Sequence, residues 1–167
     1  MEDERPGKVR DGWLKWRRFR WLLPTAQVPL AVVFGSIGLR QRWAILDRRF
    51  LGETLRHSTA VYHVWPWPYR VAASANLPAV LCGGVTSRIL GLPEGWADAC
   101  LSLPFVWLLW YWVGWRLDGW PVKSAGIFLL LTMGALVGAG LCPFGYIGFL
   151  YLGAVVWIIA MPVVIFR

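Results

Sequence analysis

Residues 125–166 read AGIFLLLTMGALVGAGLCPFGYIGFLYLGAVVWIIAMPVVIF and contain no charged side chain. A helix that crosses a bilayer needs about 20 mainly apolar residues. This stretch holds two such segments, 125–141 and 149–166, on either side of Cys142–Gly148. The sequence therefore predicts two transmembrane helices here, and we expect an all-α integral membrane protein.

Two upstream segments extend this prediction. Residues 101–115 are long enough to span if the helix reaches about 98–117, and residues 71–90 form a further apolar segment that is rich in small residues. We expect these two segments, together with 125–141 and 149–166, to form a four-span helical bundle.

The first apolar segment, residues 21–39, is interrupted by Pro24 and Pro29. It either crosses as a fifth transmembrane helix or enters the membrane and returns as a re-entrant or interfacial hairpin, which the prolines favour. The expected fold is thus a small bundle of four to five transmembrane segments. It comprises a basic, partly interfacial N-terminal region at 1–70 and the bundle at 71–167.

Composition argues against several other classes of protein. Of the 167 residues, 57% are hydrophobic and 16% are charged, whereas about 25% are charged in soluble domains. A pI near 10.0 does not by itself indicate a nucleic-acid-binding module in so hydrophobic a chain. Three cysteines are too few for a secreted domain held together by disulfides.

Basic residues are concentrated near the N-terminus, because 13 of the 17 lie in the first seventy positions. Lys and Arg accumulate in short cytoplasmic loops. If residues 40–70 are cytoplasmic and the four later segments all span, Arg116–Lys123 and Arg167 also lie inside, and the loops without basic residues lie outside. If 21–39 crosses as a signal anchor instead, these sides are inverted. We expect the bacterial plasma membrane as the location.

The region after the first apolar segment has two predicted parts. Gln41–Arg56 places its apolar and basic residues on opposite faces of a helix, which is typical of a helix lying in the membrane interface; a helix packed on a soluble partner has the same pattern. His57–Arg70 contains Pro66 and Pro68, which favour an extended chain.

Candidate chemical residues are few. His57 and His63 are six residues apart, so they do not share a helix face, and no cysteine or carboxylate pattern accompanies them to form a zinc site. Either one could serve as a single axial ligand to haem or chlorophyll. No acid lies inside a predicted span, and no nucleophile–base pair or phosphate-binding loop is present. We therefore expect no enzymatic activity and no required cofactor.

Small residues recur at helical spacing in two segments. In 71–90 they stand every fourth position, and in 125–141 they form a G-x-x-x-G pattern. Such faces let helix backbones approach closely in lipid. We expect them to pack helices together, either within the chain or against another subunit; they are Ala75, Ala79, Gly83, Ser87, Gly134 and Gly138.

Tryptophans are unusually numerous in 101–115, where they lie on several faces of one helix. Not all of them can pack inside a four-helix bundle, so we expect some to contact lipid, pigment or a neighbouring protein. The candidates are Trp107, Trp110, Trp112 and Trp115.

Basic residues near the ends of the predicted membrane segments are candidate lipid contacts. Arg17, Arg18 and Arg20 lie in an aromatic and basic stretch that is expected to bind anionic headgroups. Arg88 lies close enough to the end of its segment for its charged group to reach the interface. Alternatively, it binds a lipid phosphate or a partner carboxylate.

The cysteines have separate expectations. Cys82 lies in the middle of its segment and is expected to be an inert packing residue. Cys100 and Cys142 are predicted at one membrane face, where a disulfide forms only if their Cα atoms lie within about 7 Å.

Two functional classes follow from these features. The first is a non-catalytic accessory subunit of a larger respiratory or photosynthetic membrane complex, with membrane lipids and other integral membrane subunits as partners and no nucleic acid. The second is a stand-alone small carrier or lipid-handling protein that uses Arg88 and the interfacial helix. A haem- or chlorophyll-binding subunit ligated by His57 or His63 is a further alternative.

Overall fold

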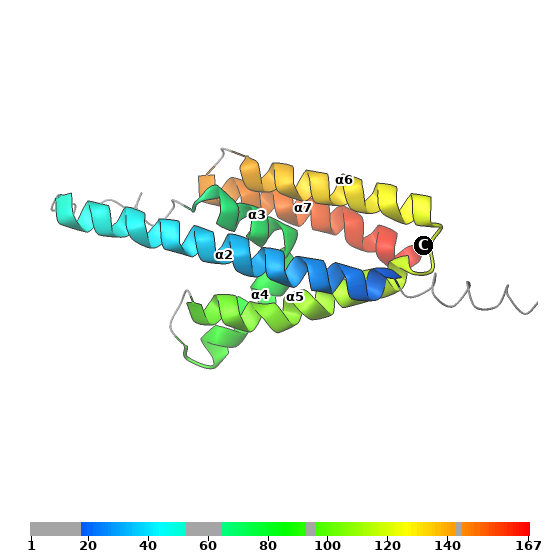
Figure 1. Cartoon of the computed structure of the whole chain (residues 1–167), viewed down its shortest axis with the longest axis horizontal. Helices are drawn as coiled ribbons and strands as arrows, with labels where there is room; N and C mark the ends of the chain where they lie inside the picture. The colour runs from blue at the N-terminus through cyan, green and yellow to red at the C-terminus, as the bar shows by residue number, and fades with distance from the viewer. Residues whose placement is uncertain (1–17, 53–64, 93–95, 143–144) are drawn as a thin grey trace, which may run out of the picture.

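The computed structural model describes residues 18–52, 65–92, 96–142 and 145–167, and all regular structure in them is helical (Figure 1). The helices are α2 (Arg18–Gly52), α3 (Trp67–Ala75), α4 (Leu77–Ile89), α5 (Trp96–Leu117), α6 (Val122–Leu141) and α7 (Gly145–Phe166).

Four of these helices are long and apolar enough to cross a membrane: Phe19–Ala44, Ala97–Leu117, Val122–Leu141 and Gly148–Phe166. The predicted class, a small helical membrane bundle, is therefore confirmed, and the chain is an integral membrane protein. The last three spans agree with the segments expected from the sequence. The first apolar segment agrees with the spanning alternative and not with the hairpin, and the second differs from expectation.

The first apolar segment belongs to one long helix. At 35 residues and 1.5 Å per residue, α2 is about 50 Å long, and its C-terminal end extends beyond the other helices in Figure 1. Pro24 and Pro29 lie inside it without ending it, as membrane helices tolerate. The segment 21–39 is therefore not a hairpin, and residues 41–52 continue the same helix.

The last four residues of the segment predicted as extended, His57–Arg70, are helical. Pro66 is the N-cap of α3, and Pro68 lies in the first turn, where a missing N–H breaks no helical hydrogen bond. The helix therefore begins at Trp67, within the segment predicted as extended. Residues 53–64, which include the end of the predicted interfacial helix, lie outside the described residues.

The bundle has two ends, which we name after one residue at each. At the Asp118 end, α2 begins, α5 ends, α6 begins and α7 ends (Figure 1). At the Arg70 end, α3 begins, α5 begins and α6 ends; there Nη1 of Arg70 donates a 2.8 Å hydrogen bond to the carbonyl oxygen of Cys142, directly after α6.

Helices α3 and α4 form a hairpin that enters and leaves at the Arg70 end. Their 9 and 13 residues give lengths of about 14 and 20 Å, whereas the apolar core of a bilayer is about 30 Å thick. Asn76, between them, is hydrogen bonded to Trp110, midway along α5. At the far end of α4, Ser87 is hydrogen bonded to Asp98 in the first turn of α5. The segment predicted as one spanning helix, 71–90, is thus two short helices.

This arrangement changes the predicted sidedness. Arg70 and Leu92 lie at the same end of the bundle, opposite Arg116 and Lys123, because the segment between the first two returns instead of crossing. Neither predicted orientation has this pattern. Both ends carry basic residues, so the accumulation of Lys and Arg in cytoplasmic loops no longer separates the two sides.

Candidate functional site

The tip of the α3–α4 hairpin is a break in the helical backbone at the middle of the bundle. Pro78 lies in the first turn of α4 and has no N–H to donate to the carbonyl of Ser74, four residues earlier. The indole Nε1 of Trp157 in α7 fills this place and donates a 3.0 Å hydrogen bond to the Ser74 oxygen. Pro78 therefore explains why the helix breaks here and why the Ser74 carbonyl needs a hydrogen-bond donor from another helix.

The side chains at the tip are also paired. Asn76 is only 2% exposed; its Oδ1 accepts a 2.7 Å hydrogen bond from Nε1 of Trp110, and its Nδ2 donates a 2.9 Å bond to the Ala72 oxygen. The hydroxyl of Ser74 donates a 2.8 Å bond to the carbonyl of Leu136 in α6. Irregular backbone at membrane depth is tolerated where protein surrounds it, and here α5, α6 and α7 supply the partners.

A cavity of about 70 Å³ lies beside the hairpin, between α2, α3, α4 and α5. It extends from Tyr69 and Asp98, near the Arg70 end, to Asn76 at the tip. Its remaining walls are mostly small or aliphatic: Ala31, Gly35, Ala72, Ala73, Val80, Ala99, Ser102, Leu103 and Val106. We call it the hairpin cavity.

Asp98 is the charged residue among those that line the hairpin cavity. It lies in the first turn of α5, where the helix dipole favours a negative charge. Its Oδ1 accepts a hydrogen bond from the hydroxyl of Ser87, and its backbone oxygen accepts a 2.6 Å bond from the hydroxyl of Ser102. The carboxylate is thus held between α4 and α5.

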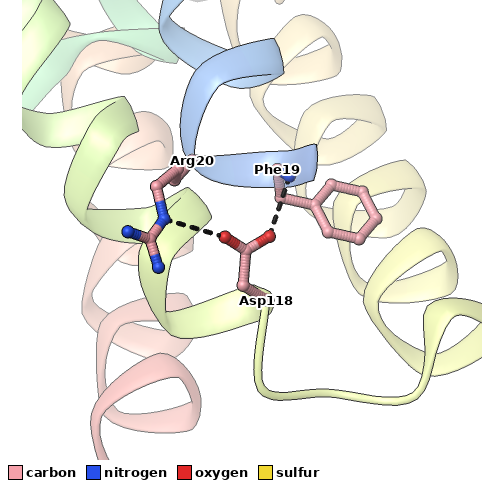
Figure 2. Close-up of polar contacts among 3 residues, drawn as sticks. All are labelled: Phe19, Arg20 and Asp118. Atoms are coloured by element: carbon pink, nitrogen blue, oxygen red, sulfur yellow. Dashed lines mark hydrogen bonds and ion pairs between the residues drawn. The ribbon is translucent and has the colours of Figure 1, made fainter. Parts of the chain in front are cut away.

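A second polar site joins α2 to α5 at the Asp118 end. Oδ1 of Asp118 accepts a 2.8 Å hydrogen bond from the backbone N–H of Phe19, and Oδ2 lies 3.2 Å from Nε of Arg20 (Figure 2). The Asp118 side chain is only 5% exposed. One carboxylate therefore caps the beginning of α2 and forms an ion pair with its first turn.

The small residues of the second apolar segment pack inside the chain. Ala75, Ala79 and Ser87 are all buried, and a Cβ on Gly83 would lie 2.7 Å from Cα of Ser102. This stripe is thus used where the hairpin meets its neighbours, chiefly between α4 and α5, and Gly83 is not available to another subunit.

The G-x-x-x-G pair of α6 lies on the surface of the bundle and not inside it. Gly134 and Gly138 are exposed, and a Cβ on either one would meet no atom within 4 Å. The inward face of α6 instead uses Gly140, where a Cβ would lie 2.5 Å from Cα of Val71.

The four tryptophans of α5 divide between the core and the surface. Trp110 is 1% exposed and packs edge-on against Trp157, so the prediction that it contacts lipid or a partner is wrong. Trp112 is half-buried against the core. Trp107 and Trp115 are exposed, and Trp107 stacks on Tyr111 with their ring centroids 5.1 Å apart.

The basic residues predicted to contact lipid or a partner also divide into one that is paired within the chain and one that is exposed. Arg20 is paired with Asp118, so its guanidinium is committed within the chain. Arg88 is exposed in the last turn of α4 and does not line the hairpin cavity. Arg17 lies outside the described residues, as do His57 and His63, and only the backbone of Arg18 is described.

All three cysteines are free thiols. Cys100 and Cys142 are therefore not joined in this structure. Cys82, which was expected to be an inert packing residue, is exposed and does not pack within the chain.

Sequence reasoning missed the residues that form the two polar sites. Asn76 was visible only as a polar residue in an apolar segment, but Asn76 and Pro78 together signal a helix break. Asp98 and Asp118 lie next to predicted span ends, where a carboxylate is ordinary; their burial depends on helices distant in the sequence. Within the described part of the chain, no group of three or more His, Cys, Asp and Glu side chains could hold a metal ion.

Comparison with protein-family models, with curated proteins and with solved structures finds no match to this chain.

Proposed function

We propose that the protein is a non-catalytic accessory subunit of a larger membrane complex, and that it binds a transmembrane helix of another subunit through the outer face of α6. The observation that supports this is a row of glycines with open space beside them. Gly126, Gly134 and Gly138 stand on α6, and a Cβ on any of them would meet nothing within 4 Å.

The position of α6 in the bundle leaves this face free. Helix α6 packs against α3 and α7 through residues that include Leu136, Ala139 and Gly140, which are buried. Its other side carries the three glycines among large exposed apolar side chains; these are Ile127, Leu130, Leu131 and Leu141. One face of α6 is therefore used within the chain, and the other resembles an unused helix-packing surface.

Glycines on this face have a physical purpose if a helix docks there. Gly in a helix interior costs about 1 kcal/mol relative to Ala in a soluble host, and none of these three relieves a contact within the chain. In lipid, helix association depends on close van der Waals packing, which small residues permit. A docked helix would rest in the groove along Gly134 and Gly138.

The non-catalytic part of the proposal rests on the interior polar groups. Asn76 and Ser74 are hydrogen bonded to neighbouring helices at the hairpin tip, and Asp118 is bonded to the beginning of α2. These groups act as links between helices. We further propose the bacterial plasma membrane as the location, where anionic headgroups would face the basic residues that precede α2.

The test is a native gel of membranes solubilised in mild detergent from cells that produce the protein naturally. We expect the wild-type chain to migrate in an assembly with a different membrane protein, and Gly134→Leu with Gly138→Leu to release it. The control is Gly84→Leu on α4, where a Cβ also meets nothing within 4 Å; this variant should stay in the assembly.

Three outcomes would contradict the proposal. In the first, the wild-type chain migrates alone. In the second, it migrates only as a multimer of itself, which would make α6 a self-association surface. In the third, the α6 variant stays in the assembly although its melting temperature equals that of the wild type.

A further inference from the structure

The hairpin cavity has a polar end and an apolar body. Near the Arg70 end it is lined by Tyr69 and Asp98, and toward the tip it runs along Ala72, Leu103 and Val106. At about 70 Å³ it admits a molecule of a few heavy atoms, well below the size of an ordinary drug-like ligand.

The charge of the lining favours a cation. Asp98 is the charged group on the wall, and its carboxylate is fixed by the Ser87 hydroxyl. An anion would be repelled at this position. Tyr69 at the same end, whose ring stacks on that of Trp65 with the centroids 4.3 Å apart, adds aromatic surface, and aromatic π faces attract cations.

The chemistry of the walls favours an organic cation over a metal ion. Hard cations such as Ca²⁺ take about six to eight oxygen ligands. Side-chain oxygens on this wall come from four residues, Tyr69, Asn76, Asp98 and Ser102, which is fewer than such an ion takes. Several of them already form hydrogen bonds within the chain: Oδ1 of Asn76 accepts from Trp110, Oδ1 of Asp98 accepts from Ser87, and the Ser102 hydroxyl donates to the Asp98 backbone. A small ammonium ion needs one carboxylate for its head and apolar contacts for its alkyl part.

We propose that the hairpin cavity binds a small organic ammonium ion, with the cationic head beside Asp98 and the alkyl chain along Leu103 and Val106. This site is separate from the outer face of α6, so it adds a ligand to the protein whether or not α6 binds a partner.

The experiment uses the purified full chain in detergent micelles, titrated with n-propylammonium and followed by ligand-observed NMR. We expect saturable binding, and at least tenfold weaker binding of n-propanol and of propanoate, which have similar shape but lack the positive charge. Asp98→Asn should weaken n-propylammonium binding at least tenfold, because the amide keeps an acceptor for Ser87 but removes the charge.

A second variant fills the cavity without touching Asp98. Gly35 lines the cavity, and a Cβ there would meet nothing within 4 Å, so Gly35→Leu adds bulk without a clash with the backbone. It should also weaken binding at least tenfold. The control, Gly84→Leu, adds the same side chain in open space on α4 and away from the cavity; it should keep the wild-type dissociation constant.

The proposal is wrong if n-propylammonium binds equally well to the wild type and to Gly35→Leu, because the signal would then come from the micelle or from another surface. It is also wrong if Na⁺ or Ca²⁺ at equal concentration displaces the ligand, which would indicate a site for inorganic cations. If Asp98→Asn does not fold, Gly35→Leu decides the result. Native-gel migration of Gly35→Leu should match the wild type, which keeps this test distinct from that of the α6 surface.

Discussion

Trp110 and Asn76, which are 34 residues apart in the sequence, are joined inside the bundle by a 2.7 Å hydrogen bond from Nε1 to Oδ1. Both side chains are almost completely buried. The bond lies where the backbone reverses between α3 and α4, so it connects the tip of the hairpin to the middle of a spanning helix.

The first prediction concerns this bond. Trp110→Phe removes the donor and leaves Oδ1 of Asn76 buried without it, which should lower the free energy of unfolding by about 1–3 kcal/mol in addition to the loss of packed ring area. Unfolding of the purified protein in mixed micelles with rising SDS measures this. Trp115→Phe, at a residue 50% exposed, is the control and should change stability little.

A double-mutant cycle separates the bond from the packing. In the background of Asn76→Leu, the acceptor is already absent, so Trp110→Phe should cost less than in the wild type. Equal costs in the two backgrounds would show that the bond contributes nothing to stability.

The second prediction concerns Asp118. Asp118→Ala removes both the cap on the Phe19 N–H and the ion pair with Arg20, and helix caps alone contribute about 1 kcal/mol. Asp118→Asn keeps an oxygen for the cap but loses the charge, so we expect it to be intermediate between the wild type and Asp118→Ala. The same SDS titration measures both variants. If Asp118→Asn were as unstable as Asp118→Ala, the ion pair and not the cap would carry the contribution.

The third prediction compares two glycines, Gly114 in a close contact between helices and Gly134 beside open space. A Cβ on Gly114 would lie 2.7 Å from Cα of Arg20, against backbone that cannot move aside without separating α2 from α5. Gly114→Ala should therefore lower the melting temperature. Gly134→Ala, where a Cβ meets open space, should leave it unchanged or raise it, because Ala has the higher helix propensity. A fall of similar size in both variants would contradict the close contact at Gly114.

The fourth prediction concerns sidedness. In a chain without its native cysteines, Gln41→Cys and Leu92→Cys should react with a membrane-impermeant thiol reagent from the same side of the membrane, and Lys123→Cys from the other. The reason is that α3 and α4 return to the side that they entered. If residues 71–90 crossed as one helix, Gln41→Cys and Leu92→Cys would be labelled from opposite sides.

The sequence was sufficient where a helix is decided by its own composition. Helices α6 and α7 and most of α5 follow from uninterrupted apolar residues, and their predicted bounds agree with the structure to within a few residues. Length and hydropathy alone determine whether such a segment spans.

The sequence was misleading where proline had two possible effects. Pro24 and Pro29 interrupt no helix, whereas Pro78 follows a complete break. Local preference does not distinguish these cases, because a break also needs partners for the freed backbone groups. The freed Ser74 carbonyl finds its partner in Trp157, and the Asn76 side chain finds its partner in Trp110. Both tryptophans lie far along the chain, so Asn76 and Pro78 indicate a helix break but do not predict that the chain turns back.

The hairpin cavity could not be predicted for the same reason. Its walls come from four helices, and Asp98 faces it only because α4 returns to the beginning of α5. Once 71–90 is assigned as a spanning helix, Asp98 is an ordinary carboxylate at the end of the predicted span 98–117.

The hairpin also constrains the order in which the helices enter the membrane while the chain is being synthesised. Each arm is shorter than a bilayer core, and the polar groups at the tip would be costly in lipid alone. The groups that satisfy them, on Trp110, Leu136 and Trp157, are all synthesised later than the hairpin itself. We therefore expect α3 and α4 to wait at the membrane surface during translation and to enter last, after α5, α6 and α7 have assembled. The order of insertion then departs from the order of synthesis.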